Sequence, residues 1–280
     1  DIYLNETSKH ADVILPPATG LETEHYDLFF NNLAVSNVAK YSPPLFKPEA
    51  GMRYDWQIFK ELTSRFKQKR SLAERLLFPF LKPSLMLNIG LKKGPYSINL
   101  KKLKSNRHGM DLGPLQPRMP EYLYTRDKKL HIAPPLLVKQ FEKLNLKQES
   151  PDLVLIGRRE LRSNNSWMHN SYRLVKGKKR CTVLINNDDA EKRNITDGDL
   201  VEVKSTKGSV SLPAEISNDI MPGVVSIPHG YGHNSPGSKM EVANAHAGVS
   251  INDLTDEGFL DALSGNAAFS GVKVEVSVLD

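Results

Sequence analysis

The chain has 280 residues, of which 39% are hydrophobic and 25% are charged, a composition typical of a globular protein with one large domain or two ordinary ones. No apolar run approaches the ~18 residues that a membrane-spanning helix needs, so we predict no membrane span. The single cysteine, Cys181, excludes an internal disulfide and a multi-cysteine metal site. One thiol suits a reducing compartment, and we predict a cytoplasmic protein.

Residues 1–66 predict the tail of an α/β domain. Short apolar strands are expected at residues 13–15 and around residues 33–38. Asp55 is expected to cap a helix, because apolar side chains recur at helical spacing after it. About sixty residues cannot close an α/β sheet, so we predict that this segment is the C-terminal remnant of a larger domain. Residues 1–5 carry no initiator Met and no signal-peptide pattern, which favours the middle of a longer protein.

Positive charge is concentrated in residues 67–129, which hold 15 Lys and Arg against 4 Asp and Glu, in a chain whose formal net charge is +6. Prolines divide this stretch into short pieces. Helices are expected at residues 72–80, 98–104 and 135–144, and a short strand at residues 129–133. We interpret residues 67–150 as a basic connector. Such a run can bind nucleic acid or an acidic partner, but a solvated surface is favoured because no aromatic side chains interleave the charges.

Residues 151–280 predict a separate domain rich in strands. Six short runs of β-branched residues lie at residues 152–156, 181–186, 199–206, 208–216, 223–227 and 272–279. Six strands at this spacing, separated by Gly, Asn and Asp turns, favour a closed barrel. A short helix with an acidic first turn is expected at residues 187–194. Cys181 is expected to be a small buried hydrophobe in the second strand.

A polar loop, residues 157–170, follows the first of these strands and contains three arginines, three asparagines, a tryptophan and a histidine. Arginines offer planar forks for phosphate, and Asn amides can pair with the edge of a heterocycle. We therefore expect a ligand that is anionic at one end and nucleobase-like or pterin-like at the other. The alternative is a solvated loop, the common case for polar loops, but Trp167 and Met168 favour ligand binding.

Two further polar segments complete the expected rim of the barrel. Residues 228–234 contain Gly230 and Gly232, which permit positive φ and a close backbone approach to a flat ligand. The other, residues 252–255 and 263–267, adds asparagine and serine side chains. The histidines of these loops lack compact zinc-ligand spacing, so a zinc site is disfavoured. The sequence has no Gly-x-Ser-x-Gly, P-loop or Gly-x-Gly-x-x-Gly motif, which excludes the common hydrolase, kinase and Rossmann interpretations.

Several separated motifs resemble the molybdopterin-dependent oxidoreductases of the dimethyl sulfoxide reductase superfamily, which include formate dehydrogenases and nitrate reductases. Residues 11–16, Ala-Asp-Val-Ile-Leu-Pro, are similar to a signature near the end of their third, α/β domain. Residues 152–203, 222–233, 247–252 and 263–269 are similar to their C-terminal molybdopterin-dinucleotide-binding domain, a double-psi β-barrel. The resemblance therefore implies a mixed fold, in which the tail of an α/β domain precedes a double-psi β-barrel.

The resemblance also implies a set of cofactor contacts. The implied residues are Gly157, Arg158, Arg159, Arg162, Asn164, Asn165, Ser166, Trp167, Met168, His169, Asn170, His229, Gly230, Gly232, His233, Asn252, Ser264 and Asn266. The implied cofactor is bis(molybdopterin guanine dinucleotide) with molybdenum or tungsten. No catalytic residue and no metal ligand is implied in this chain.

The other cofactor sites of such an enzyme, including a 4Fe–4S cluster, are expected in N-terminal domains outside this sequence. An electron-transfer subunit is a further expected partner. A formate dehydrogenase-like enzyme is the expected parent, and the chain alone is expected to be inactive. The alternative is a non-catalytic binding module, whose basic connector binds nucleic acid or an acidic partner protein.

Overall fold

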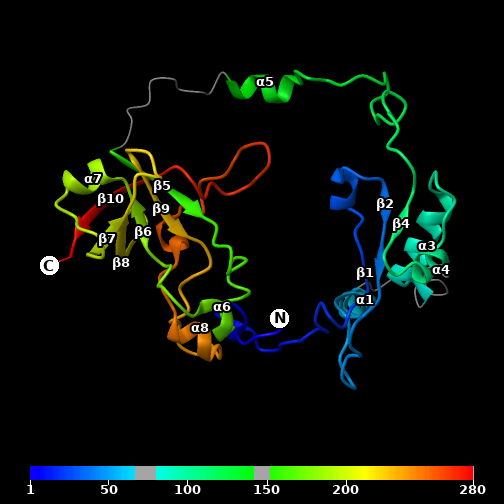
Figure 1. The fold of residues 1–280 in the computed structure, drawn as a ribbon, viewed down its shortest axis with the longest axis horizontal. Coiled ribbons are helices and arrows are strands. Elements are labelled where there is room, and N and C mark those ends of the chain that lie inside the picture. The colour runs from blue at the N-terminus through cyan, green and yellow to red at the C-terminus, as the bar shows by residue number, and fades with distance from the viewer. Residues whose placement is uncertain (67–79, 142–151, 280) are drawn as a thin grey trace. The chain divides into compact units, whose positions relative to one another are not determined.

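The computed structural model describes residues 1–66, 80–141 and 152–279 (Figure 1). It divides into two compact units. One, the helical unit, comprises Asp1–Ile2 and Ala11–Leu130, and the other, the barrel unit, comprises Tyr3–His10 and His131–Asp280. Most of the helix expected at residues 72–80 lies outside the described residues. No helix within the described ranges is long and apolar enough to cross a membrane.

The helical unit consists of short elements around a small core. Its elements are β1 (His25–Tyr26), η2 (Phe30–Leu33), β2 (Val38–Ala39), β3 (Tyr41–Ser42), α1 (Asp55–Phe66), α3 (Pro83–Lys93), α4 (Leu100–Ser105) and β4 (Met110–Asp111). β1 pairs with β3 and β2 pairs with β4, both antiparallel. The buried core residues are Ala39, Tyr41, Ile98 and Leu103. Tyr41 and Leu103 bring β3 and α4 together, so this core depends on long-range packing of short pieces.

Two predicted helices of this unit are confirmed. α1 begins at Asp55, as its apolar spacing indicates. α4 covers most of residues 98–104, and the Oδ1 of Asn99 caps it by accepting a hydrogen bond from the backbone N–H of Lys102 at 2.9 Å. α3 was not predicted, because the prolines around it were interpreted as breaks. Pro83 instead occupies its first turn, and Lys92 and Lys93 its last turn, which is the ordinary pattern of a helix with a proline start.

Three predicted strands are wrong. Residues 13–15, most of residues 33–38 and residues 129–133 are not strands, and only Val38 of these enters one. Their apolar side chains are exposed: Val13 is 74% exposed, Val35 94% and Ile132 93%. A short strand needs a neighbour to take its backbone hydrogen bonds. Within the described part of the chain, no strand lies beside residues 13–15 or 129–133.

The barrel unit confirms the predicted closed barrel of six strands. The strands are β5 (Leu153–Arg158), β6 (Val183–Ile185), β7 (Leu200–Lys204), β8 (Ser209–Ile216), β9 (Val224–Pro228) and β10 (Val272–Val278), in the order β10-β5-β9-β6-β8-β7. β10 pairs with β5 and with β7, which closes the sheet. The other elements of this unit are η1 (Ser8–His10), α5 (Pro135–Phe141), α6 (Tyr172–Val175), α7 (Asn187–Glu191), α8 (Glu241–Ala245) and η4 (Ile251–Leu254).

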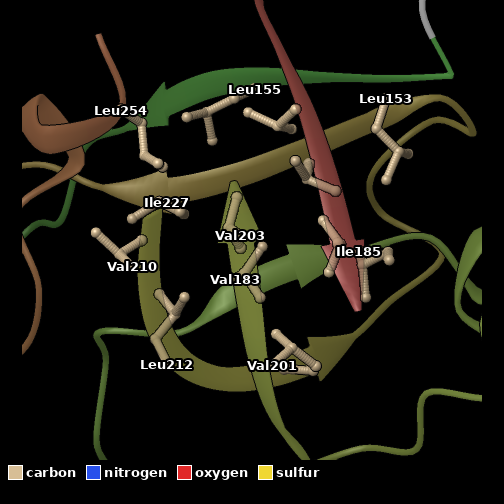
Figure 2. Close-up of a cluster of buried hydrophobic side chains, with 14 of the residues drawn as sticks. Leu153, Leu155, Val183, Ile185, Val201, Val203, Val210, Leu212, Ile227 and Leu254 are labelled. Atoms are coloured by element: carbon tan, nitrogen blue, oxygen red, sulfur yellow. The ribbon is translucent and has the colours of Figure 1, made fainter. Parts of the chain in front are cut away.

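Alternation along the strands builds the core of the barrel. In β7 and β8 every second side chain points inward, so Val201, Val203, Val210 and Leu212 meet Ile227 of β9 inside the barrel (Figure 2). Burying one such side chain contributes about 1.5–3 kcal/mol, which makes this core the main source of the unit's stability. η4 adds Ile251 and Leu254 to the same cluster. That packing holds the residues around Asn252 against the barrel.

Parallel pairing of β5 with β9 places two loops side by side. The two strands run in register from Val154 opposite Val224 to Arg158 opposite Pro228, which is the last residue of each strand. The loops that follow, residues 159–171 and 229–240, therefore leave the barrel at the same end. β6 is antiparallel to β9, so the residues before β6 also reach this end. We call it the loop end of the barrel.

Candidate functional site

A cleft of about 1040 Å³ lies at the loop end of the barrel. This volume is at the upper end of the ~300–1,000 Å³ usual for ligand pockets. Arg159, Asn165 and Ser166 of the first loop line it. Residues 229–236 of the second loop and residues 248–253 also line it. The structure therefore brings together the loops after β5 and β9, which the sequence predicted to share a ligand.

Two glycines allow these three segments to meet. Gly230 has φ +88°, and a Cβ there would lie 2.2 Å from the carbonyl oxygen of Asn165. Gly232 has φ +105°, and its Cβ would lie 2.8 Å from the Cβ of Ser250. The positive φ expected of both glycines is confirmed. Any larger residue at either position would separate the three segments.

The cleft carries a cation and an imidazole on adjoining walls. Arg159 is exposed, and its guanidinium donates a hydrogen bond to the side-chain oxygen of Asn165. His229 is half-buried, and its backbone N–H donates to the carbonyl of Arg158 at 3.0 Å. Burial, and then the charge of Arg159, lower the pKa of His229. The imidazole is therefore neutral at physiological pH, so Arg159 supplies the positive charge of these two side chains.

Arg158 is turned away from the cleft and binds the backbone of the barrel. Its guanidinium donates to the carbonyl of Ser226 at 3.2 Å, the carbonyl of Thr182 at 3.3 Å and the Oγ1 of Thr182 at 3.1 Å. It also pairs with Glu160 at 3.2 Å. These bonds tie the ends of β5, β6 and β9 together. The proposed contact of Arg158 with a ligand is not tested by this arrangement and stays a prediction.

His169 and Asn170 belong to the first loop but do not line the cleft. The Oδ1 of Asn170 accepts hydrogen bonds from the backbone N–H groups of Val242 at 3.1 Å and Ala243 at 3.3 Å. Asn170 therefore caps α8 from a distant part of the chain. His169 is 2% exposed, and its Nδ1 lies 2.8 Å from the Nε2 of His233. Both residues support the wall of the cleft.

The other predicted contacts are dispersed around the cleft. Gly157 packs against the ring of His229, since a Cβ there would lie 2.2 Å from its Nε2. Asn252 and His233 line the cleft. The members of the predicted set that do not line it, and whose side chains are exposed, are Arg162, Asn164, Trp167, Met168, Ser264 and Asn266. The roles of all these residues stay predictions.

Some cleft residues were not expected from the sequence. Glu6 lines the cleft although it lies 227 positions from its partner His233, and no local pattern marks it. Tyr231, Ser250 and Phe269 also line the cleft. They lie within the stretches that resemble the known family but were not among the implied cofactor contacts. Among the described residues, no group of three or more His, Cys, Asp or Glu side chains is placed to hold a metal ion.

Comparisons with known proteins agree with this location. Residues 153–273 match the family model described as "Molydopterin dinucleotide binding domain". The chain is 34% identical over 127 residues to ArrA, the molybdopterin-containing subunit of the arsenate respiratory reductase of Chrysiogenes arsenatis, covering 42% of this chain and 15% of that protein. It is 29% identical over 111 residues to a tetrathionate reductase of Salmonella typhimurium, covering 34% of this chain and 11% of the matched protein.

A solved structure shares the fold. Acetylene hydratase from Pelobacter acetylenicus aligns with a TM-score of 0.64 and 17% identity, covering 95% of this chain and 38% of that one. All three alignments span well under two thirds of the relative's length. The family match falls on the barrel, where the cleft lies. Residues 153–273 therefore belong to the molybdopterin-dinucleotide-binding domain family, and the chain is similar to parts of the two reductase subunits named above.

Proposed function

We propose that the cleft at the loop end of the barrel holds the guanine dinucleotide part of a molybdopterin cofactor. One observation carries the proposal: the loops after β5 and β9 line a single cleft of about 1040 Å³ within the matched domain. Parallel pairing of the two strands is the reason that the loops converge. A ligand in this cleft would touch both.

The residues present fit a dinucleotide. A pyrophosphate needs a cationic fork or N–H donors, and Arg159 offers the fork. Heterocycle edges need fixed amides and hydroxyls, which Asn165, Ser166 and Asn252 provide in the lining of the cleft. Gly230 and Gly232 let the second loop pack directly against Asn165 and Ser250, which fixes the shape of the cleft.

The predicted residues are proposed to act in three groups. Arg159, Asn165, Ser166, His229, Gly230, Gly232, His233 and Asn252 contact the cofactor on the cleft walls. Gly157, Arg158, His169 and Asn170 hold those walls in place. Arg162, Asn164, Trp167, Met168, Ser264 and Asn266 are proposed to contact cofactor that extends beyond the cleft. When bound, the cofactor supplies the metal at which the redox reaction occurs, and this chain supplies its binding and orientation.

The proposed reaction is the reduction of a small oxidised substrate. Two relatives are named for arsenate and tetrathionate reduction, and both of these compounds are oxyanions. The formate dehydrogenase-like activity implied by the resemblance stays a prediction. An assay of the whole enzyme with formate and with oxyanions distinguishes formate oxidation from oxyanion reduction.

The proposal also covers the enzyme around this chain. We assign bis(molybdopterin guanine dinucleotide) with molybdenum or tungsten, a 4Fe–4S cluster outside this chain, a cytoplasmic location and an electron-transfer subunit. We further propose a barrel of the double-psi type, supported by the two parallel pairs β5–β9 and β6–β8. Residues 1–66 are proposed as the tail of an α/β domain, residues 67–150 as a connector and residues 151–280 as the cofactor-binding domain.

The test compares two arginines in the enzyme that carries this chain. Arg159→Ala should lower bound molybdenum or tungsten and extractable guanine nucleotide by about tenfold or more, because it removes a charge-assisted fork. Arg173→Ala, on the exposed surface of α6, is the matched control and should retain both. Metal analysis and mass spectrometry of the extracted cofactor measure the difference. Equal cofactor content in the two variants would contradict the proposal.

A further inference from the structure

The helices α3 and α4 carry a concentration of positive charge. Residues 81–110, which include both helices, hold seven Lys and Arg and no Asp or Glu. Among the described residues, none of the seven forms an ion pair. All seven side chains are exposed, and they are Lys82, Lys92, Lys93, Lys101, Lys102, Lys104 and Arg107.

The two helices are fixed to each other and to the core of the helical unit (Figure 1). The Oδ1 of Asn88 on α3 accepts a hydrogen bond from the backbone N–H of Leu100 on α4 at 3.0 Å. Leu103 of α4 is buried in that core, and Leu87 and Leu91 of α3 pack against it. The other sides of both helices are therefore left as exposed surface.

An open groove of about 490 Å³ lies between α3 and α4. Leu85 of α3 and Lys101 and Lys104 of α4 line it. Ile89 and Lys92 follow Leu85 at positions i+4 and i+7, so they lie on the same side of α3. Leu85 is 42% exposed and Ile89 is 45% exposed. We call these five residues the basic–apolar face.

Lysines beside exposed aliphatic side chains fit an anionic lipid surface. Ammonium groups attract the charged headgroups, and aliphatic side chains enter the boundary between headgroups and acyl chains. Lysines alone are typical of a solvated surface. The aliphatic side chains of Leu85 and Ile89 beside them are the feature that a solvated surface does not require.

An acidic protein and nucleic acid fit this face less well. Protein–protein interfaces are enriched in Arg and depleted in Lys, whereas six of the seven cations in residues 81–110 are Lys. Single-stranded nucleic acid stacks on aromatic rings, and the basic–apolar face contains none. Contacts with the phosphates of duplex DNA make no use of aliphatic side chains.

We propose that the basic–apolar face docks this chain on an anionic lipid surface. Lys92, Lys101 and Lys104 bind the charged headgroups, while Leu85 and Ile89 enter the outer edge of the acyl region. α3 has 11 residues and is therefore about 17 Å long, too short to cross a hydrocarbon core of about 30 Å, so it lies along the surface. The docking is independent of the cleft and of the cofactor proposed there.

Cosedimentation of this chain with lipid vesicles tests the proposal. The probe is a vesicle of phosphatidylcholine with about 30% phosphatidylserine, at about 0.1 M salt, and the reference is a vesicle of phosphatidylcholine alone. Partitioning to the anionic vesicle should be at least about tenfold stronger. Equal partitioning to the two vesicles, or binding to neither, would overturn the proposal. Tighter binding, per negative charge, to duplex DNA or to polyglutamate would also overturn it.

Neutralised variants test whether the location of the charge matters. Lys92→Gln, Lys101→Gln and Lys104→Gln, combined in one chain, should weaken partitioning to the anionic vesicle by at least about tenfold. A control chain loses the same charge from exposed lysines of the barrel unit and should lose less than about twofold. The control substitutions are Lys176→Gln, Lys204→Gln and Lys273→Gln. Equal losses in the two chains would mean that only net charge acts, which contradicts a defined face.

A substitution of the apolar part completes the test. Ile89→Gln should weaken partitioning by about threefold to fivefold, because it removes an aliphatic side chain from the lipid boundary. Met221→Gln, at a residue of the barrel unit that is 68% exposed, is the control and should have no effect. Equal partitioning of the two variants would rule out insertion of the aliphatic side chains and with it the proposed docking.

Amide hydrogen exchange locates the contact in the unmodified chain. On addition of the anionic vesicle, α3 and α4 should exchange at least about threefold more slowly, whereas β8 should not change. This measurement needs no variant to fold. Slower exchange elsewhere in a chain that sediments with the vesicle, with α3 and α4 unchanged, would assign the docking to another surface.

Discussion

Neighbouring arginines have different environments at the loop end of the barrel. Arg158 is 20% exposed in its side chain and bonds to backbone groups of β6 and β9, whereas Arg159 is exposed in the cleft. The residue type predicts a phosphate-binding group in both positions. Position decides between them, since Arg158 is the last residue of β5 and bonds across to Thr182 and Ser226, whereas Arg159 is the first residue of the loop that lines the cleft. Arg159 is therefore the better candidate for a ligand contact.

This difference predicts opposite costs for the two substitutions. Arg158→Ala should lower the free energy of unfolding by about 2–4 kcal/mol, because it leaves buried carbonyl groups and Glu160 without a donor. Arg159→Ala should change it by less than about 0.5 kcal/mol. Urea unfolding followed by circular dichroism measures both. A stable Arg158→Ala variant would mean that water replaces the guanidinium at no cost.

His169 predicts a loss of stability in acid. Its folded pKa, about 4, is below the usual 6.5, so its contribution is fully present above pH 6.5 and is lost as the pH falls toward about 4. The shift corresponds to at most about 3 kcal/mol, since one unit is worth 1.36 kcal/mol. Wild type should therefore lose more stability than His169→Gln between about pH 7 and about pH 4. Urea midpoints at both pH values measure this, and parallel losses in the two proteins would contradict it.

At the scale of elements, the end of β5 depends on the second loop. A Cβ on Gly157 would lie 2.2 Å from the Nε2 of His229, so the imidazole must move if the residue is enlarged. Gly157→Ala should shift the imidazole signals of His229 in NMR spectra and weaken binding of guanosine diphosphate by about tenfold. Gly20→Ala, with open space around its Cβ and no positive φ, is the control. Equal spectra and affinities in the two variants would show that His229 does not shape the cleft.

The elements that sequence predicted well are those with a complete local pattern. β8 buries every second side chain from Val210 to Ala214, so its pattern identifies a strand without knowledge of its partners. α7 is capped by Asn186, whose Oδ1 accepts from the backbone N–H of Asp188 at 2.9 Å, as its acidic first turn predicts. The strands expected at residues 13–15 and 33–38 rest on three and four apolar residues, respectively. Such short runs depend on a neighbour that the sequence does not specify.

The candidate site also combines features that the sequence predicts with features that depend on tertiary contacts. Its two loops were predicted to share the rim of one barrel, and both line the cleft. The side-chain directions of Arg158 and Asn170 could not be predicted, because they depend on the register with β9 and on the position of α8. Glu6 could not be found either, since its partner His233 is 227 positions away. Local sequence therefore indicates which loops bind, and tertiary contacts decide which side chains take part.

At the scale of the whole molecule, the two units differ in the size of their cores. The barrel unit buries side chains from all six strands and η4, whereas the helical unit buries Ala39, Tyr41, Ile98 and Leu103. The helical unit also exposes many large apolar side chains, among them Phe30 at 74% and Val35 at 94%. A groove of about 1090 Å³ between α3 and residues 26–38 has a largely apolar lining. Apolar surface of this extent is typical of an interaction face.

The difference in core size predicts that the helical unit opens first. Each buried aliphatic side chain contributes about 1.5–3 kcal/mol, so four buried residues offset far less chain entropy than the barrel cluster does. As the urea concentration rises, amide hydrogen exchange should become fast first in α1, α3 and α4. The amides of β7 and β8 should stay protected to a higher urea concentration. Mass spectrometry of peptides from this chain measures the order, and Leu103→Ala should move the first transition to lower urea without moving the second. Because Leu103 packs only in the core of the helical unit among the described residues, a shift of both transitions would mean that the two units unfold as one.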